Sequence, residues 1–154
     1  MMIDPIQIAL PTEETTAALA ATIAPRLVPG DVILLEGSIG AGKSAFARAL
    51  IRARLGRMED VPSPTFTLVQ TYEDPDGDLW HCDLYRLTDP DEAFELGLDE
   101  AFATAICLIE WPDRLGTLTP DGALQMHFAA GDTSHAVTIA MTPEWQKKLG
   151  PLHV

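Results

Sequence analysis

The sequence predicts an α/β fold, and three of its features lead to that prediction. Residues 31–35 form a short apolar segment with the composition of a buried strand. A glycine-rich segment follows directly, and residues 45–55 then show a helical pattern that Gly56 closes. Residues 105–110 are almost wholly apolar until the last one, which is the pattern of a central strand buried on both faces.

One strand and one helix are expected before the glycine-rich segment. Residues 6–10 alternate weakly between apolar and polar and predict a short strand. Thr12 is the expected N-cap of a helix with acids in its first turn. That helix should run to about Ala24, because Pro25 disfavours its continuation.

The middle of the chain predicts a hairpin followed by short helices. Residues 65–72 and 78–85 are rich in β-branched and aromatic side chains, so they indicate two antiparallel strands joined by a turn. Asp89 is the expected cap of a helix that ends at Gly97. Residues 99–103 are expected to add a further helical turn.

The last third predicts a second hairpin and a terminal helical turn. Its strands are expected at residues 123–128 and 135–141, and the helical turn at residues 143–149. No internal repeat or low-complexity linker interrupts the pattern, and 154 residues suffice for one domain, 1–154.

Composition narrows the class of protein. No apolar run approaches the roughly 18 residues of a membrane span, and no secretory signal is visible. Cys82 and Cys107 are too few and too far apart for a zinc motif, so we expect small core residues and a location in the reducing cytoplasm.

The net charge of −13 also restricts the partners. Binding to nucleic acid depends largely on neutralising phosphates, so a chain this acidic should not bind RNA well alone. If it acts in RNA biology, a partner should hold the RNA.

Residues 37–44 match G-x-x-x-x-G-K-[ST], the pattern of a phosphate-binding loop (P-loop). Its glycines let successive backbone N–H groups converge on phosphate oxygens, and the following helix start adds partial positive charge. Lys43 is expected to reach the terminal phosphates and the Ser44 hydroxyl to hold Mg²⁺. The alternative is a glycine-rich turn followed by a surface lysine. The predicted nucleotide contacts in this segment are Gly37, Ser38, Ile39, Gly40, Ala41, Gly42, Lys43, Ser44 and Ala45.

Two carboxylates at strand ends are candidates to serve a nucleotide. Glu110 ends the apolar strand, where open α/β sheets bind ligands; the alternative is an acid that faces water. Asp83 follows the other candidate strand, and its alternative role is an ion pair with Arg86. Trp111 is either an aromatic wall of the site or part of the core.

The four histidines give no ligand spacing. His81 could relay protons, but a half-buried strand position is the simpler interpretation. We expect His127, His135 and His153 to be surface or packing residues.

Several segments appear in an order that resembles the TsaE family, also called YjeE, small bacterial P-loop ATPases required to make threonylcarbamoyladenosine in tRNA. The resemblance spans nearly the whole chain. Beyond the P-loop it rests on S-P-T-F-T-L-V at 63–69, H-C-D-L-Y-R-L at 81–87, E-L-G at 95–97 and I-C-L-I-E-W-P at 106–112.

The resemblance implies a P-loop NTPase-like α/β domain with a central mixed β-sheet flanked by helices. It implies weak ATP hydrolysis by the chain alone, activated by TsaD-like and TsaB-like proteins. TsaD transfers the threonylcarbamoyl group to tRNA, and the ATPase supports repeated turnover. The chain would then meet tRNA only through the complex, with no membrane involved.

The resemblance also assigns roles to single residues. Ser44 and Glu110 would bind Mg²⁺, Lys43 would act on the ATP phosphates, and Asp83 would support hydrolysis. Residues 63–67 would form a switch loop, with Thr65 and Thr67 as its polar candidates. Two weaker assignments place Glu13 and Gly131 against the nucleotide. Ser38 replaces the acid that is common in the family loop, which leaves any docking role of that position open.

Three other functions compete with this one. A small-molecule kinase usually needs an arginine-rich lid, but four of the ten Lys and Arg residues lie at 48–57 behind the P-loop. A GTPase is disfavoured because N-K-x-D, the pattern for guanine, does not occur. D-x-x-G does occur, but its two matches at 74–77 and 113–116 show how weak that pattern is. A non-catalytic module that senses ATP through the 62–71 loop remains open.

Overall fold

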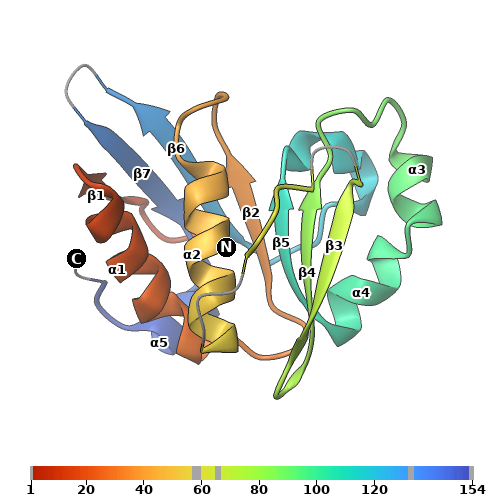
Figure 1. Ribbon diagram of the computed structural model, residues 1–154, viewed down its shortest axis with the longest axis horizontal. Helices are drawn as coiled ribbons and strands as arrows, with labels where there is room; N and C mark the ends of the chain where they lie inside the picture. Colours follow the sequence, from red (N-terminus) through yellow and green to blue (C-terminus); the bar gives the residue numbers. More distant parts are fainter. Residues whose placement is uncertain (1, 57–59, 65–66, 132–133, 153–154) are drawn as a thin grey trace.

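The computed structural model describes residues 2–56, 60–64, 67–131 and 134–152 and places its strands in one mixed sheet (Figure 1). The seven strands have the order β1-β7-β6-β2-β5-β4-β3. They are β1 Ile6–Leu10, β2 Val32–Glu36, β3 Val69–Asp74, β4 Gly77–Asp83, β5 Ile106–Glu110, β6 Leu124–Ala130 and β7 His135–Ala140.

Helices flank this sheet, which confirms the predicted α/β class. The α-helices are α1 Glu13–Ile23, α2 Lys43–Leu55, α3 Pro90–Glu95, α4 Leu98–Thr104 and α5 Pro143–Leu149. Two 3₁₀ helices, η1 Ala24–Arg26 and η2 Pro112–Leu118, complete the described elements.

The centre of the sheet is parallel and its two edges are antiparallel. β2 lies between β5 and β6 and is parallel to both, and β5 is also parallel to β4. The hairpins β3–β4 and β6–β7 add antiparallel pairs, and β1 pairs with β7. The mixed sheet that the family resemblance implied is therefore present.

The apolar composition of β2 supplies both halves of the core, because successive side chains of a strand point to opposite faces. Ile33 and Leu35 pack with α1 and α2 on one face. Val32 and Leu34 pack on the other face with residues of α3, α4 and η2. β5 is likewise buried along its whole length, as its sequence predicted.

Local end signals place the helices close to their predicted bounds. Thr12 caps α1 by accepting a hydrogen bond from the backbone N–H of Thr15 at 3.2 Å. Asp89 caps α3 in the same manner, through the N–H of Asp91 at 2.9 Å. Gly56 ends α2 with a left-handed φ of 72°, a conformation that costs glycine little. The start of α2 differs from the prediction, since the helix begins at Lys43 and not at 45.

The first hairpin differs more from the strands that the sequence predicted. β3 begins at Val69, although its β-branched composition predicted a strand from residue 65. The N–H of Leu68 donates to the carbonyl of Pro64 at 2.7 Å, which closes a turn where the strand was expected, and Leu68 has a φ of 68°. Thr65 and Phe66 lie outside the described residues. β4 ends at Asp83 and not at Tyr85, because a turn closed by Leu87 N–H and Leu84 carbonyl follows.

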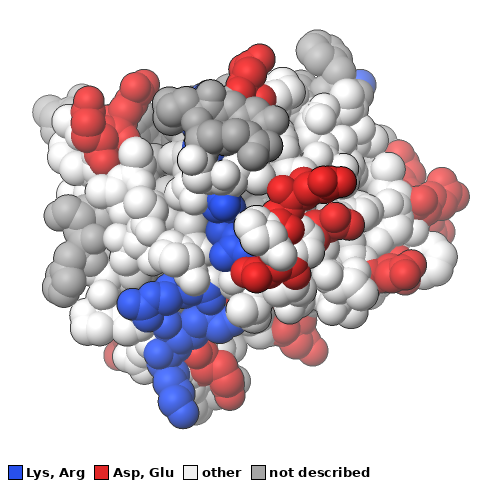
Figure 2. Space-filling view, turned by 60° about the horizontal axis from the view of Figure 1, so that its bottom comes forward, with Lys and Arg blue, Asp and Glu red and all other residues white. Residues whose placement is uncertain are grey.

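Basic side chains collect at one end of the molecule (Figure 2). They lie where helices end: Arg26 in η1, Arg52 and Arg54 in α2, and Lys147 and Lys148 in α5. Cations stabilise a helix C-terminus, so this placement complements the helix dipoles. In the part of the chain that the structure describes, no helix has the length and apolar character to cross a bilayer.

Candidate nucleotide-binding site

The P-loop joins the end of β2 to the start of α2, as the sequence predicted. Gly37, Gly40 and Gly42 have φ values of 134°, 82° and 111°, which residues other than glycine rarely adopt. At Gly37 the neighbouring strand also leaves no room, because an added Cβ would lie 2.3 Å from the carbonyl oxygen of Phe128 in β6. The loop is therefore held close against β6.

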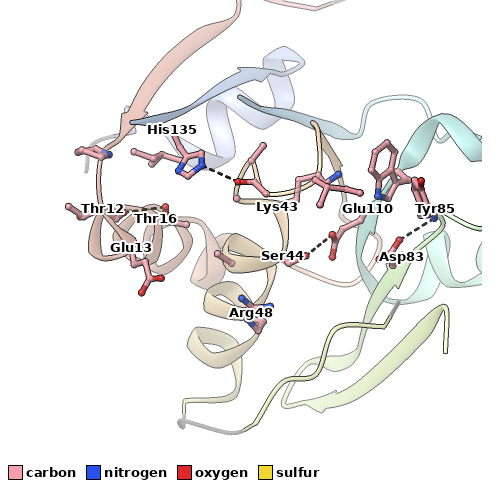
Figure 3. Close-up of a pocket in the computed structure, with 18 residues that line it drawn as sticks. Thr12, Glu13, Thr16, Lys43, Ser44, Arg48, Asp83, Tyr85, Glu110 and His135 are labelled. Atoms are coloured by element: carbon pink, nitrogen blue, oxygen red, sulfur yellow. Dashed lines mark hydrogen bonds between the residues drawn. The ribbon is translucent and has the colours of Figure 1, made fainter. Parts of the chain in front are cut away.

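A cavity of about 720 Å³ opens over this loop (Figure 3). Its wall includes most of the predicted nucleotide and catalytic residues, namely Glu13, Ile39, Gly40, Ala41, Gly42, Lys43, Ser44, Ala45, Asp83 and Glu110. Trp111 lines the cavity and also packs against the core, so both of its interpretations hold. The wall further contains residues that no sequence motif indicated, namely Thr12, Thr16, Arg48, Tyr85 and His135.

The remaining predicted site residues lie elsewhere or cannot be placed. Gly37 and Ser38 belong to the loop but do not line the cavity. Gly131 does not line it either; its N–H donates to the Ser134 carbonyl at 2.8 Å, and an added Cβ would lie 2.6 Å from that oxygen. The structure thus gives Gly131 a role in closing the β6–β7 hairpin. Thr65 lies outside the described residues, and Thr67 is exposed and accepts a hydrogen bond from Gln70 at 2.9 Å.

Lys43 is held inside the site. Only 5% of the residue is exposed; its Nζ donates to the carbonyl of Gly37 and lies 3.7 Å from the centre of the Trp111 ring. Burial lowers the pKa of Lys43, and the nearby carboxylates of Glu110, Asp83 and Asp113 oppose part of that shift. A surface lysine, the alternative for this position, is therefore excluded.

The two candidate carboxylates meet because β4 and β5 are parallel neighbours, in which Asp83 pairs with Glu110. Glu110 is 2% exposed, so it does not face water as the alternative required. Its Oε1 accepts a hydrogen bond from the Ser44 hydroxyl at 2.9 Å (Figure 3). Asp83 is 7% exposed, and its Oδ1 accepts the N–H of Tyr85 at 3.1 Å.

The Ser44 and Glu110 oxygens suit a magnesium ion. Mg²⁺ prefers hard oxygen ligands and usually takes one or two from protein, leaving the other positions to phosphate and water. The Ser44 hydroxyl and the Glu110 carboxylate match that preference, because they are in contact with each other in the cavity wall. This donor set fits the ion that the family resemblance implied.

Two histidines differ from their expected places. His81 is fully buried, not half-buried, because β4 lies inside the sheet; its Nε2 is 2.7 Å from Oε2 of Glu110. His135 is exposed as expected, but it also lines the cavity, and its Nε2 donates to the carbonyl of Gly40 at 3.0 Å. Neither contact has a local signal in the sequence, since the partners are 29 and 95 residues away. His127 is a surface residue, as expected, and His153 lies outside the described residues.

The family model described as "Threonylcarbamoyl adenosine biosynthesis protein TsaE" matches residues 10–138. This chain belongs to the TsaE family. Similar curated proteins carry the description tRNA threonylcarbamoyladenosine biosynthesis protein TsaE. The one from Rickettsia bellii is 40% identical over 121 residues, 79% of this chain and 84% of its own. The one from Bacillus subtilis is 40% identical over 127 residues, 81% and 78% of the two chains.

A solved structure supports the same assignment for the fold. The crystal structure of Bacillus subtilis YdiB superposes with a TM-score of 0.77 and 30% sequence identity. The match covers 97% of this chain and 93% of YdiB. The TsaE resemblance and the fold class expected from the sequence are thus both confirmed.

Proposed function

We propose that this chain is an ATP-binding and weakly ATP-hydrolysing subunit of the complex that forms threonylcarbamoyladenosine in tRNA, acting as one P-loop ATPase domain. The family and the descriptions of its relatives supply the tRNA modification. The observation that carries the ATPase part is the contact of Ser44 with Glu110 in the cavity above the P-loop. It supports the proposal because the two residues proposed to bind the metal touch beside the P-loop.

The proposed roles follow the positions of the groups. The backbone N–H groups of residues 37–45 hold the phosphates together with the ammonium of Lys43. Ser44 and Glu110 hold Mg²⁺, which when bound neutralises charge that develops on the phosphates. Asp83, beside Glu110, orients the attacking water. Glu13, Thr12 and Thr16 line the far end of the cavity, where the nucleoside part would lie.

The acidic surface favours an indirect relation to tRNA. A net charge of −13 opposes direct binding to phosphates, so the TsaD-like and TsaB-like partners are the components that hold the RNA. ATP hydrolysis by this chain would support repeated turnover of their transferase reaction. The two free, buried cysteines suit the cytoplasm, in which we place this work.

The decisive experiment measures phosphate release from ATP without any added acceptor. The chain is assayed alone, then with TsaB-like and TsaD-like proteins, and then with tRNA as well. We expect slow release alone and faster release with the partners, and we expect excess GTP to compete poorly. Tight ATP binding with no release under any of these conditions would instead support a non-catalytic ATP sensor. Release only when a small acceptor is added would support a kinase.

A further inference from the structure

His81 lies directly behind the proposed magnesium ligand and has no part in the function proposed above. Its side chain is fully buried in β4, and its Nε2 is 2.7 Å from Oε2 of Glu110, which is itself 2% exposed. The other oxygen of that carboxylate faces Ser44 at 2.9 Å. The three residues therefore form one chain of contacts from the sheet interior to the P-loop.

The hydrogen between the two side chains belongs to the imidazole. An ionised carboxylate only accepts hydrogen bonds, so Oε1 of Glu110 accepts from Ser44 and Oε2 accepts from Nε2–H of His81. Within the described residues, Nδ1 of His81 is buried without a hydrogen-bond partner. The geometry thus assigns to His81 an Nε2–H that donates to Glu110.

An ordinary core residue does not account for this arrangement. An apolar side chain at position 81 would fill the interior without leaving a polar nitrogen unsatisfied. It would, however, leave Oε2 of Glu110 without the donor that the described residues provide, at a place that water hardly reaches. With histidine at position 81, one ring nitrogen stays unpaired, but the Glu110 carboxylate receives a hydrogen bond that fixes its orientation.

We propose that His81 is a positioning residue for the metal site: its Nε2–H holds Oε2 of Glu110 so that Oε1 faces Ser44 and the ion. This inference rests on the proposed function, because it assigns His81 to the magnesium ligand named there. Outer partners of metal ligands commonly act in this way, by fixing the orientation of the ligand. A free Glu110 carboxylate would have to be ordered each time Mg²⁺ and nucleotide bind.

Two amide substitutions separate positioning from packing. The amide nitrogen of glutamine can reach the place of Nε2, whereas that of asparagine reaches only the place of Nδ1. His81→Gln should therefore keep the donor to Glu110, and His81→Asn should lose it. Both variants bury an uncharged amide at the same position. The free-energy cost of burying that amide is therefore shared, and each variant serves as the control for the other. Thermal unfolding of both shows that the comparison is made on folded protein.

The first readout is binding of ADP by titration calorimetry, with Mg²⁺ and with a chelator. We expect His81→Asn to weaken ADP binding about tenfold in Mg²⁺, the lower end of the range for outer-partner substitutions. Binding in chelator should stay unchanged, and His81→Gln should bind ADP in Mg²⁺ more tightly than His81→Asn, with an affinity near that of wild type. Equal affinities of both variants in Mg²⁺, whether reduced together or both unchanged, would overturn the proposal.

The second readout needs neither metal nor nucleotide. Nitrogen-15 NMR of the ligand-free wild type should show a slowly exchanging proton on Nε2 of His81. Glu110→Gln should alter that signal. An Nε2 without a proton in the wild type would contradict the assigned hydrogen bond.

The two proposals fail in different ways. Wild-type protein that binds ADP with no dependence on Mg²⁺ would remove the metal site, and the role of His81 with it. Wild-type protein with normal Mg²⁺ dependence that His81→Asn leaves unchanged would remove only the role of His81.

Discussion

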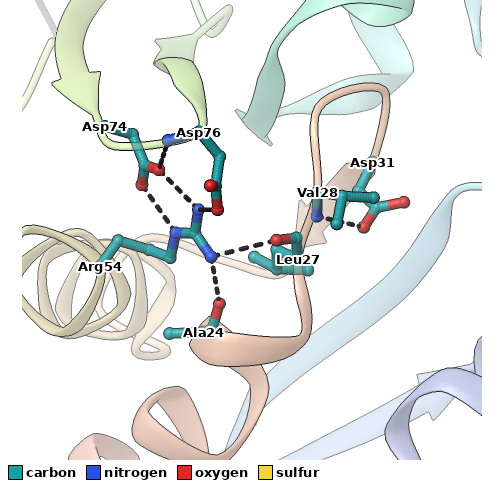
Figure 4. A network of polar contacts seen from close by, with 7 residues as sticks. All are labelled: Ala24, Leu27, Val28, Asp31, Arg54, Asp74 and Asp76. Carbon is teal, nitrogen blue, oxygen red and sulfur yellow. Dashed lines mark hydrogen bonds and ion pairs between the residues drawn. The ribbon is translucent and has the colours of Figure 1, made fainter.

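The guanidinium of Arg54, in the last turn of α2, binds the carboxylate of Asp74 at the end of β3 through two parallel contacts (Figure 4). Nε lies 2.7 Å from Oδ2 and Nη2 lies 2.6 Å from Oδ1. The side chains are 7% and 0% exposed. Nη1 of the same arginine donates to the carbonyls of Ala24 and Leu27 at 2.9 and 3.0 Å. One side chain thus joins the P-loop helix, η1 and the β3–β4 hairpin.

Removing this arginine should destabilise the fold. Arg54→Met leaves the buried Asp74 carboxylate without its main partner, and breaking such pairs typically costs about 3–5 kcal/mol. The measurement is the free energy of unfolding in urea. Adding Asp74→Leu to Arg54→Met removes the unpaired carboxylate charge. The double variant should therefore recover part of the lost free energy of unfolding. A single variant within about 1 kcal/mol of wild type would show that the pair is not a main support.

The same pair makes stability depend on acid pH. Burial alone would raise the pKa of Asp74, but hydrogen bonds from Arg54 and the Asp76 N–H, together with the arginine charge, leave the pKa below its ordinary 3.8. A lowered folded-state pKa contributes stability that is complete above 3.8 and is lost as the pH falls through the folded value. Asp74→Asn should therefore flatten the loss of unfolding free energy below about pH 4. Urea titrations between pH 6 and 2 test this, and parallel pH curves would contradict it.

Substitution by alanine should have different effects at two glycines of the P-loop. Gly37→Ala would bring a Cβ to 2.3 Å from the Phe128 carbonyl, so the loop or β6 must shift. Gly40→Ala meets nothing within 4 Å and faces only its φ of 82°, a strain of about 1–2 kcal/mol. We expect Gly37→Ala to lose more unfolding free energy and more ATP affinity than Gly40→Ala. Urea unfolding and ATP titration of the two variants supply the comparison, and the reverse order would be the contrary result.

Lys43→Ala should nearly abolish nucleotide binding. Lys43 is a buried cation of the cavity wall, so the phosphates would lose their main charged partner. ATP titration followed by intrinsic tryptophan fluorescence measures the effect, because one of the three tryptophans, Trp111, lies 3.7 Å from the Lys43 amine in the wild type. Calorimetry controls for a change in the optical signal alone. Wild-type ATP affinity in this variant would remove Lys43 from the site.

Glu110→Ala should keep the fold but lose the magnesium dependence of ATP binding or turnover. The substitution removes one of the two protein oxygens of the proposed ion site, while the P-loop and Lys43 remain. ATP affinity is compared across a Mg²⁺ titration, with Asp83→Asn as the matched change on the neighbouring strand. We expect Asp83→Asn to bind Mg-ATP normally and to hydrolyse it more slowly. Wild-type magnesium dependence in Glu110→Ala would exclude Glu110 as a ligand.

Local signals in the sequence predicted much of the fold. The caps Thr12 and Asp89 and the terminal Gly56 act through their own backbone neighbourhood, so their effects can be inferred from a short window. The start of β3 was wrong because composition favours a strand from residue 65, while the bond from Leu68 to the Pro64 carbonyl closes a turn. Intrinsic strand preference does not include that competition.

The site was predictable where it is contiguous in sequence and not where separate segments meet. The P-loop lies within a single stretch, so its pattern was sufficient. The bond between His81 and Glu110 depends on the register of β4 and β5, and the bond from His135 to Gly40 depends on how β7 lies beside the loop. Neither relation can be derived from spacing along the chain.

The position of β2 has a consequence for synthesis on the ribosome. Residues 32–36 emerge early, but both of their sheet neighbours are encoded far downstream, at 106–110 and 124–130. Phe128, whose carbonyl lies close to Gly37, belongs to the later of these two strands, residues 124–130. Pairing of sequence-distant strands is slow because a long segment must be closed first. The nascent chain therefore cannot complete the sheet around β2, which positions the P-loop, until most of it has been translated.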